Sequence, residues 1–266
     1  MNASEQAKEL IREVFFLIGK GKKDKAISQL EKALSLAKEI SSEYLQPYVL
    51  NEIAQAFFKL DKTQEAIQVV REVINITNQI IFTASRLEIL LEVAKSLSEI
   101  SSKTKNAQIL QEALEIVKGI LANITERPHI DIAHEAAVVL RNIIKNAESI
   151  SVFREILAIS AQLNDKNYRN MLMRNLSYRL SELCKNTTDT SFINNVLKLV
   201  KQIEPPSYRF KAITQIARHL AKTAERTLNS NLIQSALEIS DKIPSEYFRS
   251  KIKSKLSILK DKAEKQ

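Results

Sequence analysis

The sequence of 266 residues contains only three glycines, Gly19, Gly21 and Gly119, together with five prolines and no tryptophan. Average usage would place roughly 7% glycine in such a chain. Folds that hold nucleotides on Gly-rich turns, and all-β folds with tight hairpins, need glycine where the backbone adopts special geometry. The chain has neither a GxGxxG nor a GxxxxGK[ST] motif. These absences exclude the nucleotide folds, argue against sheets, and favour long helices joined by few turns.

Other scarce features limit the compartment and the chemistry. Cys184 is the single cysteine, so the chain has neither an internal disulfide framework nor a Cys-based zinc site. No apolar run approaches the roughly 18 residues of a membrane span, and the polar start MNASEQAKEL lacks the regions of a secretory signal. We therefore expect a folded, cytoplasmic protein. Abundant Ile, Lys and Glu beside scarce Gly and Cys resemble a thermophile-like composition.

The net charge of +9 is distributed unevenly. Residues 249–266 hold seven basic and two acidic side chains, which account for +5 of the total, and a smaller basic run covers 20–25. The rest of the chain is only mildly basic. This weakens the charge argument for a nucleic-acid partner, because phosphate binding needs clustered cations.

Short motifs recur along the chain at fixed offsets. The motif EIAQ at 52–55 recurs forty residues later as EVAK at 92–95, and 123 residues beyond that as QIAR at 215–218. A second motif, ALEI, stands at 113–116 and again at 236–239, with the same offset of 123. Two motifs that share one offset indicate a tandem repeat with a period near forty residues.

Each repeat has the apolar pattern of two antiparallel helices, helix A with the first motif and helix B with the second. The predicted pairs cover 3–40, 42–80, 83–124, 128–163, 166–204 and 206–243, and a capping helix covers 245–266. Such repeats bury their apolar faces only against their neighbours. We therefore predict an all-α, right-handed α-solenoid of about six helix pairs that forms a single domain over 1–266.

The first two repeats resemble the tetratricopeptide repeat. The residues that carry the resemblance are Leu10, Val14, Leu17, Gly21, Ala26, Leu30 and Ala33 in the first repeat, and Leu50, Ile53, Ala54, Phe57, Ala66, Val70 and Val73 in the second. Asp61 stands where the family has a turn glycine. Repeats three to six carry about seven more residues between their motifs, so the resemblance is to a divergent, long-helix variant of this TPR-like family.

The resemblance implies a non-enzymatic scaffold that binds a peptide or partner protein in a concave groove. The groove positions carried over from the family are Asn51, Gln55, Phe58, Glu88, Leu91, Lys95, Arg174, Tyr178, Lys211 and Arg218. Amides, aromatics and cations at these positions suit an acidic or extended peptide, with Arg and Tyr as anchors. The alternative interpretation is an ordinary solvated helix face.

An arginine recurs near the start of helix A, at Arg86, Arg169, Arg209 and Arg249, the last three at intervals of forty. A cation at this end opposes the helix dipole, so a second interaction must hold it there. We favour a structural ladder, in which each arginine reaches the last carbonyls or an acidic residue of the preceding B helix. The alternative is a row of anion receptors.

No residue pattern indicates catalysis or metal binding. His129, Asp131 and His134 form the one metal-like cluster, but their spacing does not place all three on one helix face and is not HExxH. Cys184 is interpreted as a small core residue. We predict no enzymatic activity, no cofactor and no metal, since neither a Ser-His-Asp nor a paired-carboxylate spacing is present.

Two further functions stay open beside the expected protein or peptide partner. Helical repeats also bind single-stranded RNA, but here the cations concentrate in the C-terminal helix and the few aromatics lack repeat-registered groove positions for base stacking. Binding of RNA or another polyanion is therefore the second choice. Self-association through the terminal repeats is the third, because an open-ended solenoid exposes an apolar face unless it is capped. No membrane association is expected.

Overall fold

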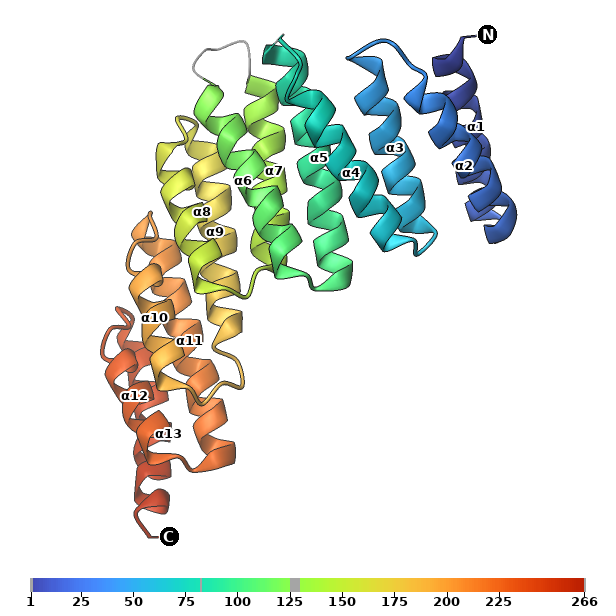
Figure 1. Ribbon diagram of the computed structural model, residues 1–266. Helices are drawn as coiled ribbons and strands as arrows, with labels where there is room; N and C mark the ends of the chain where they lie inside the picture. Colours follow the sequence, from blue (N-terminus) through green and yellow to red (C-terminus); the bar gives the residue numbers. More distant parts are fainter. Residues whose placement is uncertain (1, 82, 125–129, 266) are drawn as a thin grey trace. The chain divides into compact units, whose positions relative to one another are not determined.

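The computed structural model describes residues 2–81, 83–124 and 130–265, and over these residues it contains thirteen α-helices and no strand (Figure 1). The helices are α1 (Ala3–Gly19), α2 (Lys23–Lys38), α3 (Leu45–Lys59), α4 (Thr63–Thr77), α5 (Thr83–Thr104), α6 (Ala107–Asn123), α7 (Ile130–Asn146), α8 (Ile150–Gln162), α9 (Lys166–Leu183), α10 (Thr190–Val200), α11 (Pro206–Thr227), α12 (Ser230–Ser240) and α13 (Glu246–Ala263). Two helices fall in each of the six predicted pairs, and one follows them. The prediction of an all-α helical-repeat fold is confirmed.

The chain divides into two compact units, Met1–Asn146 and Ala147–Gln266, and each is described by itself. We call them unit 1 and unit 2. The division lies between α7 and α8, inside the fourth predicted pair. The assignment of the whole chain to a single domain stays a prediction.

Unit 1 is built from helix hairpins in two layers. The pairs α1–α2, α3–α4 and α5–α6 pack together, and the A helices α1, α3, α5 and α7 contact one another in chain order (Figure 1). Ala26, Leu30 and Ala33 on α2 and Val14 on α1 are fully buried. The small alanines allow the two helices to approach closely, as the family pattern implies. The A helices therefore form one continuous layer, which carries the candidate site.

The turns between helices A and B keep their geometry where glycine is replaced. Gly21 has φ 71° and Asp61, forty residues on, has φ 63°. The left-handed conformation costs a non-glycine residue roughly 1–2 kcal/mol. Asp61 also accepts hydrogen bonds from Lys103 Nζ at 2.7 Å and Lys23 Nζ at 2.9 Å, and these two lysines hold the pKa of its carboxyl at about 2. The aspartate thus replaces the flexibility of glycine with ion pairs to two other helices.

Unit 2 repeats the arrangement with α9, α11 and α13 as neighbouring A helices. Three of its helices begin at Asp or Asn caps, since the side chains of Asp165, Asp189 and Asn229 accept hydrogen bonds from backbone N–H groups of α9, α10 and α12. The final helix, α13, packs on α11 and α12 and buries Ile252 and Leu256. The predicted final helix is therefore present and packed on the last pair, and its role as a cap stays a prediction.

The extra residues of the later repeats are only partly helical. In the third and sixth pairs they lengthen helix A, because α5 and α11 have 22 residues whereas α1 has 17 and α3 has 15. In the fifth pair α9 has 18 residues, and the segment 184–189 connects it to α10. The long-helix prediction therefore holds best for the third and sixth pairs.

Candidate functional site

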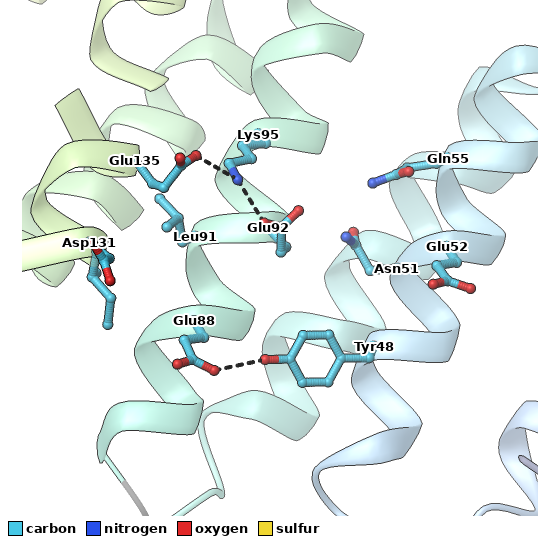
Figure 2. Close-up of a pocket in the computed structure, with 11 residues that line it drawn as sticks. Tyr48, Asn51, Glu52, Gln55, Glu88, Leu91, Glu92, Lys95, Asp131 and Glu135 are labelled. Carbon is cyan, nitrogen blue, oxygen red and sulfur yellow. Dashed lines mark hydrogen bonds and ion pairs between the residues drawn. The ribbon is translucent and has the colours of Figure 1, made fainter. Parts of the chain in front are cut away.

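The candidate site of unit 1 is a groove of about 510 Å³ on its layer of A helices (Figure 2). Its lining residues come from α3, α5 and α7: Tyr48, Asn51, Glu52, Gln55, Glu88, Leu91, Glu92, Lys95, Asp131, Ile132 and Glu135. We call it the α3–α5–α7 groove. A second hollow of about 510 Å³ shares Glu52 and Gln55 with it and extends to α1, where Lys8, Ile11, Arg12 and Phe15 line it together with Lys59 of α3.

The groove is built from the same helix positions in successive repeats. The equivalent pairs, forty residues apart, are Tyr48 and Glu88, Asn51 and Leu91, Glu52 and Glu92, and Gln55 and Lys95. Within each helix these positions follow the spacing i, i+3, i+4, i+7, which places them on one face. Stacking the A helices side by side then turns four positions of one helix into a continuous wall.

The lining is strongly acidic. Five of the eleven residues are carboxylates, Glu52, Glu88, Glu92, Asp131 and Glu135, and Lys95 is the one cation among them. Carboxylates gathered along one wall create a negative potential that attracts cations and repels anions. The expectation of an acidic peptide in this part of the groove therefore does not fit the structure, whose charge favours a basic ligand.

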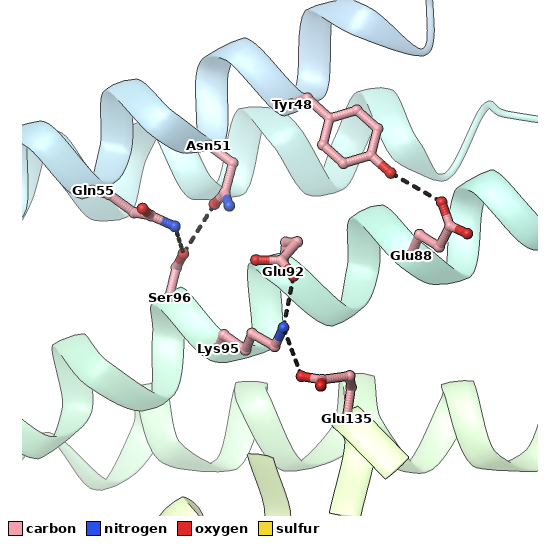
Figure 3. A network of polar contacts seen from close by, with 8 residues as sticks. All are labelled: Tyr48, Asn51, Gln55, Glu88, Glu92, Lys95, Ser96 and Glu135. Atoms are coloured by element: carbon pink, nitrogen blue, oxygen red, sulfur yellow. Dashed lines mark hydrogen bonds and ion pairs between the residues drawn. The ribbon is translucent and has the colours of Figure 1, made fainter. Parts of the chain in front are cut away.

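Lys95 is held by two of these carboxylates. Its Nζ lies 2.7 Å from Glu92 of the same helix and 3.0 Å from Glu135 of α7 (Figure 3). Burial lowers the pKa of Lys95, but the hydrogen bonds and charges of Glu92 and Glu135 outweigh it, so that the pKa is raised. The ammonium group therefore stays charged and ties α5 to α7. The carboxylates of Glu52, Glu88 and Asp131 are the more exposed part of the lining.

Tyr48 and Glu88 join α3 to α5 at one end of the groove. The Tyr48 hydroxyl donates a hydrogen bond of 3.2 Å to Glu88 (Figure 3). Burial, followed by the charge of Glu88 and this hydrogen bond, raises the pKa of Tyr48 to about 12. The phenol therefore stays protonated at neutral pH and orients the Glu88 carboxylate.

Asn51 and Gln55 meet the hydroxyl of Ser96 on α5. Ser96 Oγ donates to Asn51 Oδ1 at 3.1 Å and accepts from Gln55 Nε2 at 3.3 Å (Figure 3). Asn51 is only 4% exposed and Ser96 only 3%. This part of the groove wall thus holds α3 against α5, and the two amides serve packing as well as lining.

The other predicted groove residues lie elsewhere. Phe58 is half-buried outside this lining, with Lys103 Nζ 5.0 Å from its ring centroid. Arg174, Tyr178 and Lys211 are exposed side chains of unit 2 that line neither this groove nor the cleft described below. The structure therefore brings together Asn51, Gln55 and Lys95, together with Glu88 and Leu91, and places Arg218 in a separate cleft of unit 2.

Three of the repeated arginines contact the end of the preceding helix B. Arg169 donates to the carbonyl of Leu163 at 2.8 Å, Arg209 to the carbonyl of Lys201 at 3.2 Å and to Glu204 at 3.4 Å, and Arg249 to the carbonyl of Ile243 at 3.2 Å. Arg86 is half-buried near the start of α5. These carbonyls lie at or just beyond helix C-termini, where cations are favoured. The structural interpretation of the ladder remains the one we favour.

The remaining candidates supply no reactive group to the groove. Cys184 is buried, and burial raises the pKa of its thiol to about 12. His129 lies outside the described residues. Over the residues that are described, no cluster of three His, Cys, Asp or Glu side chains is placed to hold a metal ion. In the same part of the chain, no helix is both long enough and apolar enough to cross a bilayer.

Sequence reasoning missed six groove residues: Tyr48, Glu52, Glu92, Asp131, Ile132 and Glu135. The offset of forty from a predicted groove position identifies Tyr48, which stands at the register of Glu88. Glu52 and Glu92 share a register of their own beside it. The same offset reaches α7, because Asp131, Ile132 and Glu135 stand forty residues after Leu91, Glu92 and Lys95. The ion pair between Glu135 and Lys95 depends on how α7 packs on α5.

The paired helices, the repeated register and the groove on the A helices define a TPR-like helical-repeat protein. A family model described as tetratricopeptide repeat matches residues 16–40, which cover the end of α1 and all of α2. No curated protein sequence matches the chain significantly.

Solved helical-repeat structures are similar at low identity. A structure titled as nearly identical TPR-like repeats of a putative kinesin light chain from Podosopora anserina has 19% identity and a TM-score of 0.44, covering 79% of this chain and 98% of that one. A circular tandem repeat protein with novel repeat topology has 11% identity and a TM-score of 0.38, covering 99% and 72%. At these scores the superpositions carry no argument. The assignment to the repeat class rests on the helices themselves and on the matched segment.

Proposed function

We propose that this protein is a non-enzymatic interaction scaffold whose α3–α5–α7 groove binds an extended, basic segment of a partner protein. The observation that carries the proposal is the lining itself, with five carboxylates and one lysine that two of them already neutralise. Helical-repeat proteins use such concave surfaces to hold extended partners. The tetratricopeptide resemblance also implies a protein partner.

The lining supports binding rather than chemistry. It contains no histidine, cysteine, serine or threonine. The raised pKa values of its tyrosine and its lysine keep both groups protonated at neutral pH, which disfavours either as a nucleophile. Its acidic charge also opposes a nucleic acid, whose phosphates need cations. We therefore place the partner of this groove among proteins, and we propose no enzymatic activity for the chain.

Lysine or arginine side chains at alternate positions of the partner suit the wall. The exposed carboxylates of Glu52, Glu88 and Asp131 offer acceptors from three successive A helices, and the mostly buried Leu91 and Ile132 supply apolar surface beside them. Arginine fits best, because its planar guanidinium donates two parallel hydrogen bonds to one carboxylate.

Fluorescence anisotropy with labelled twelve-residue peptides tests this proposal. An alternating Arg-Ser peptide should bind the full chain at low salt, and an alternating Glu-Ser peptide of the same length should not. The double variant Glu88→Gln/Asp131→Asn removes two groove charges, each worth about 0.2–1 kcal/mol when exposed. It should weaken binding of the basic peptide about fivefold.

The matched control is Glu31→Gln/Glu39→Gln. It removes the same charge from exposed positions at α2 and its C-terminal cap, outside the groove. This variant should bind within about twofold of the unchanged protein. Equal losses in the two double variants would mean that net charge alone attracts the peptide. Preference for the acidic peptide would refute the proposal.

A further inference from the structure

A second concave site lies in unit 2, between the A helix α11 and the capping helix α13. It is a cleft of about 320 Å³ lined by Arg218, Ala221 and Lys222 of α11 and by Tyr247, Phe248, Lys251, Ile252 and Lys255 of α13. We call it the α11–α13 cleft. Its size falls within the range of clefts that hold small organic groups.

The charge of this cleft is opposite to that of the groove in unit 1. Four of its eight lining residues are cations and none is a carboxylate. Glu225, outside the lining, ion-pairs with Lys255 at 2.7 Å. This leaves Arg218, Lys222 and Lys251 as the cations directed at a ligand. An anion entering the cleft therefore meets positive charge from both walls.

The repeat register shows that the reversal is specific to these positions. Lys251 and Lys255 of α13 stand at the positions that Glu88 and Glu92 hold in α5, because the offset of 123 and one further repeat of forty separate the two helices. Arg218 stands 123 residues after Lys95, and at this position both units have a cation. The same helix face thus carries carboxylates in one unit and lysines in the other, so the two sites select ligands of opposite charge.

Two aromatic rings stand beside these cations. Tyr247 is 67% exposed and Phe248 is 37% exposed, and their centroids lie 5.2 Å apart in an edge-to-face arrangement. The Arg218 guanidinium lies 4.6 Å from the Phe248 centroid, and Lys251 Nζ lies 6.0 Å from that of Tyr247. Phe248 shares its register with Tyr168 and Tyr208, whereas Tyr247 has no aromatic counterpart, and packing of α13 on α11 places both rings at the cations. Proteins that bind single-stranded nucleic acid combine exposed aromatic rings, on which bases stack, with cations that bind the phosphates.

We propose that the α11–α13 cleft binds single-stranded nucleic acid, with one base stacked on Tyr247 and the flanking phosphates held by Arg218, Lys222 and Lys251. An acidic peptide would satisfy the cations but would leave the exposed ring face unused. The aromatic pair therefore favours a nucleic acid over a peptide. This site is separate from the groove proposed for protein partners, so each can fail without the other.

Anisotropy with fluorescein-labelled twelve-nucleotide oligo-U and oligo-dT on the full chain tests the proposal. With three phosphates neutralised, the logarithm of affinity should fall with the logarithm of salt at a slope of about −2, so binding weakens roughly 20-fold between 50 and 200 mM salt. The variant Lys222→Gln/Lys251→Gln should reduce the slope to about −0.7 and weaken binding at least tenfold at 50 mM salt. Lys262→Gln/Lys265→Gln removes the same charge outside the cleft and should change binding less than twofold.

The stacking contribution is tested at Tyr247. Tyr247→Leu removes the ring and should weaken binding about fivefold or more, whereas Tyr247→Phe keeps it and should bind like the unchanged protein. An abasic oligomer of the same length should bind as weakly as Tyr247→Leu binds oligo-U. The proposal is overturned if the abasic oligomer or a poly-Glu peptide binds as tightly as oligo-U. It is also overturned if Lys262→Gln/Lys265→Gln loses as much affinity as Lys222→Gln/Lys251→Gln.

Discussion

Two serines of α5 provide the sharpest test of the packing at the groove. Ser96 and Ser98 are 3% and 2% exposed, and they lie two residues apart on one helix. Ser96 Oγ is hydrogen-bonded to Asn51 and Gln55, whereas Ser98 Oγ is buried and has no hydrogen-bond partner among the residues described. Replacing each by alanine removes the same atom from the same helix. The pair therefore isolates the value of the hydrogen bonds.

The magnitude follows from what each hydroxyl leaves behind. Ser96→Ala leaves the buried Asn51 Oδ1 without its donor, which costs about 1–3 kcal/mol. Ser98→Ala removes an unpaired buried hydroxyl, so no hydrogen bond is lost. Both changes gain a few tenths of a kcal/mol of helix propensity, which cancels in the comparison. We expect Ser96→Ala to be less stable than Ser98→Ala by about 1–3 kcal/mol.

Urea denaturation followed by circular dichroism measures this difference. At an m-value of about 3 kcal/mol/M, the two midpoints should differ by about 0.3–1 M. The double variant Asn51→Leu/Ser96→Ala replaces both partners by apolar groups and should regain part of the loss. Equal midpoints for the two alanine variants would refute the reasoning, and so would a Ser98→Ala variant that is the less stable of the two.

Two more predictions concern unit 2. Arg169→Gln loses a charged hydrogen bond of 2.8 Å to the carbonyl of Leu163 and should lower the free energy of unfolding by about 1.5 kcal/mol in urea denaturation. The control Arg174→Gln changes an exposed side chain and should alter the free energy of unfolding by less than about 0.5 kcal/mol. Similar losses in both variants would contradict the structural ladder. Burial raises the pKa of the Cys184 thiol from its ordinary value of 9.0 to about 12, so the thiol should react with Ellman's reagent at pH 8 only after unfolding. Because the unfolded thiol releases its proton first, the free energy of unfolding should fall between pH 9 and 12, and a Cys184→Ala variant should lose less stability over that range.

The helix pairs could be predicted because their signal is local. Apolar residues recur with the helical period, and small residues such as Ala26 and Ala33 mark where two helices approach. The turn at Asp61 was also placed correctly, although aspartate occupies the left-handed position that glycine holds at Gly21. The position of the extra residues in the later repeats was less predictable. The same segment can either extend helix A or lengthen the connection to helix B, and the sequence does not distinguish the two.

The candidate site was predictable only in its register. The offset of forty identifies Gln55 and Lys95 as equivalent positions, but it does not show that Lys95 is neutralised by Glu135 of the next A helix. The sequence alone suggested an acidic ligand, because cations stand among the predicted groove positions and the sequence does not show which carboxylates pair with them. The charge of a groove belongs to side chains from several helices, which only packing brings together.

The amino-acid sequence was therefore enough to predict the all-α repeat, its period near forty residues, the final helix and the face of helix A that lines the candidate groove, because each depends on spacing within one or two helices. The tertiary structure decided the acidic wall across α3, α5 and α7 and the basic aromatic cleft between α11 and α13. Tyr247 and Arg218 lie 29 positions apart in the chain, yet both line one cleft. Electrostatic and stacking interactions act across space, so the ligand preference of each site depends on contacts that exist only once the helices have packed.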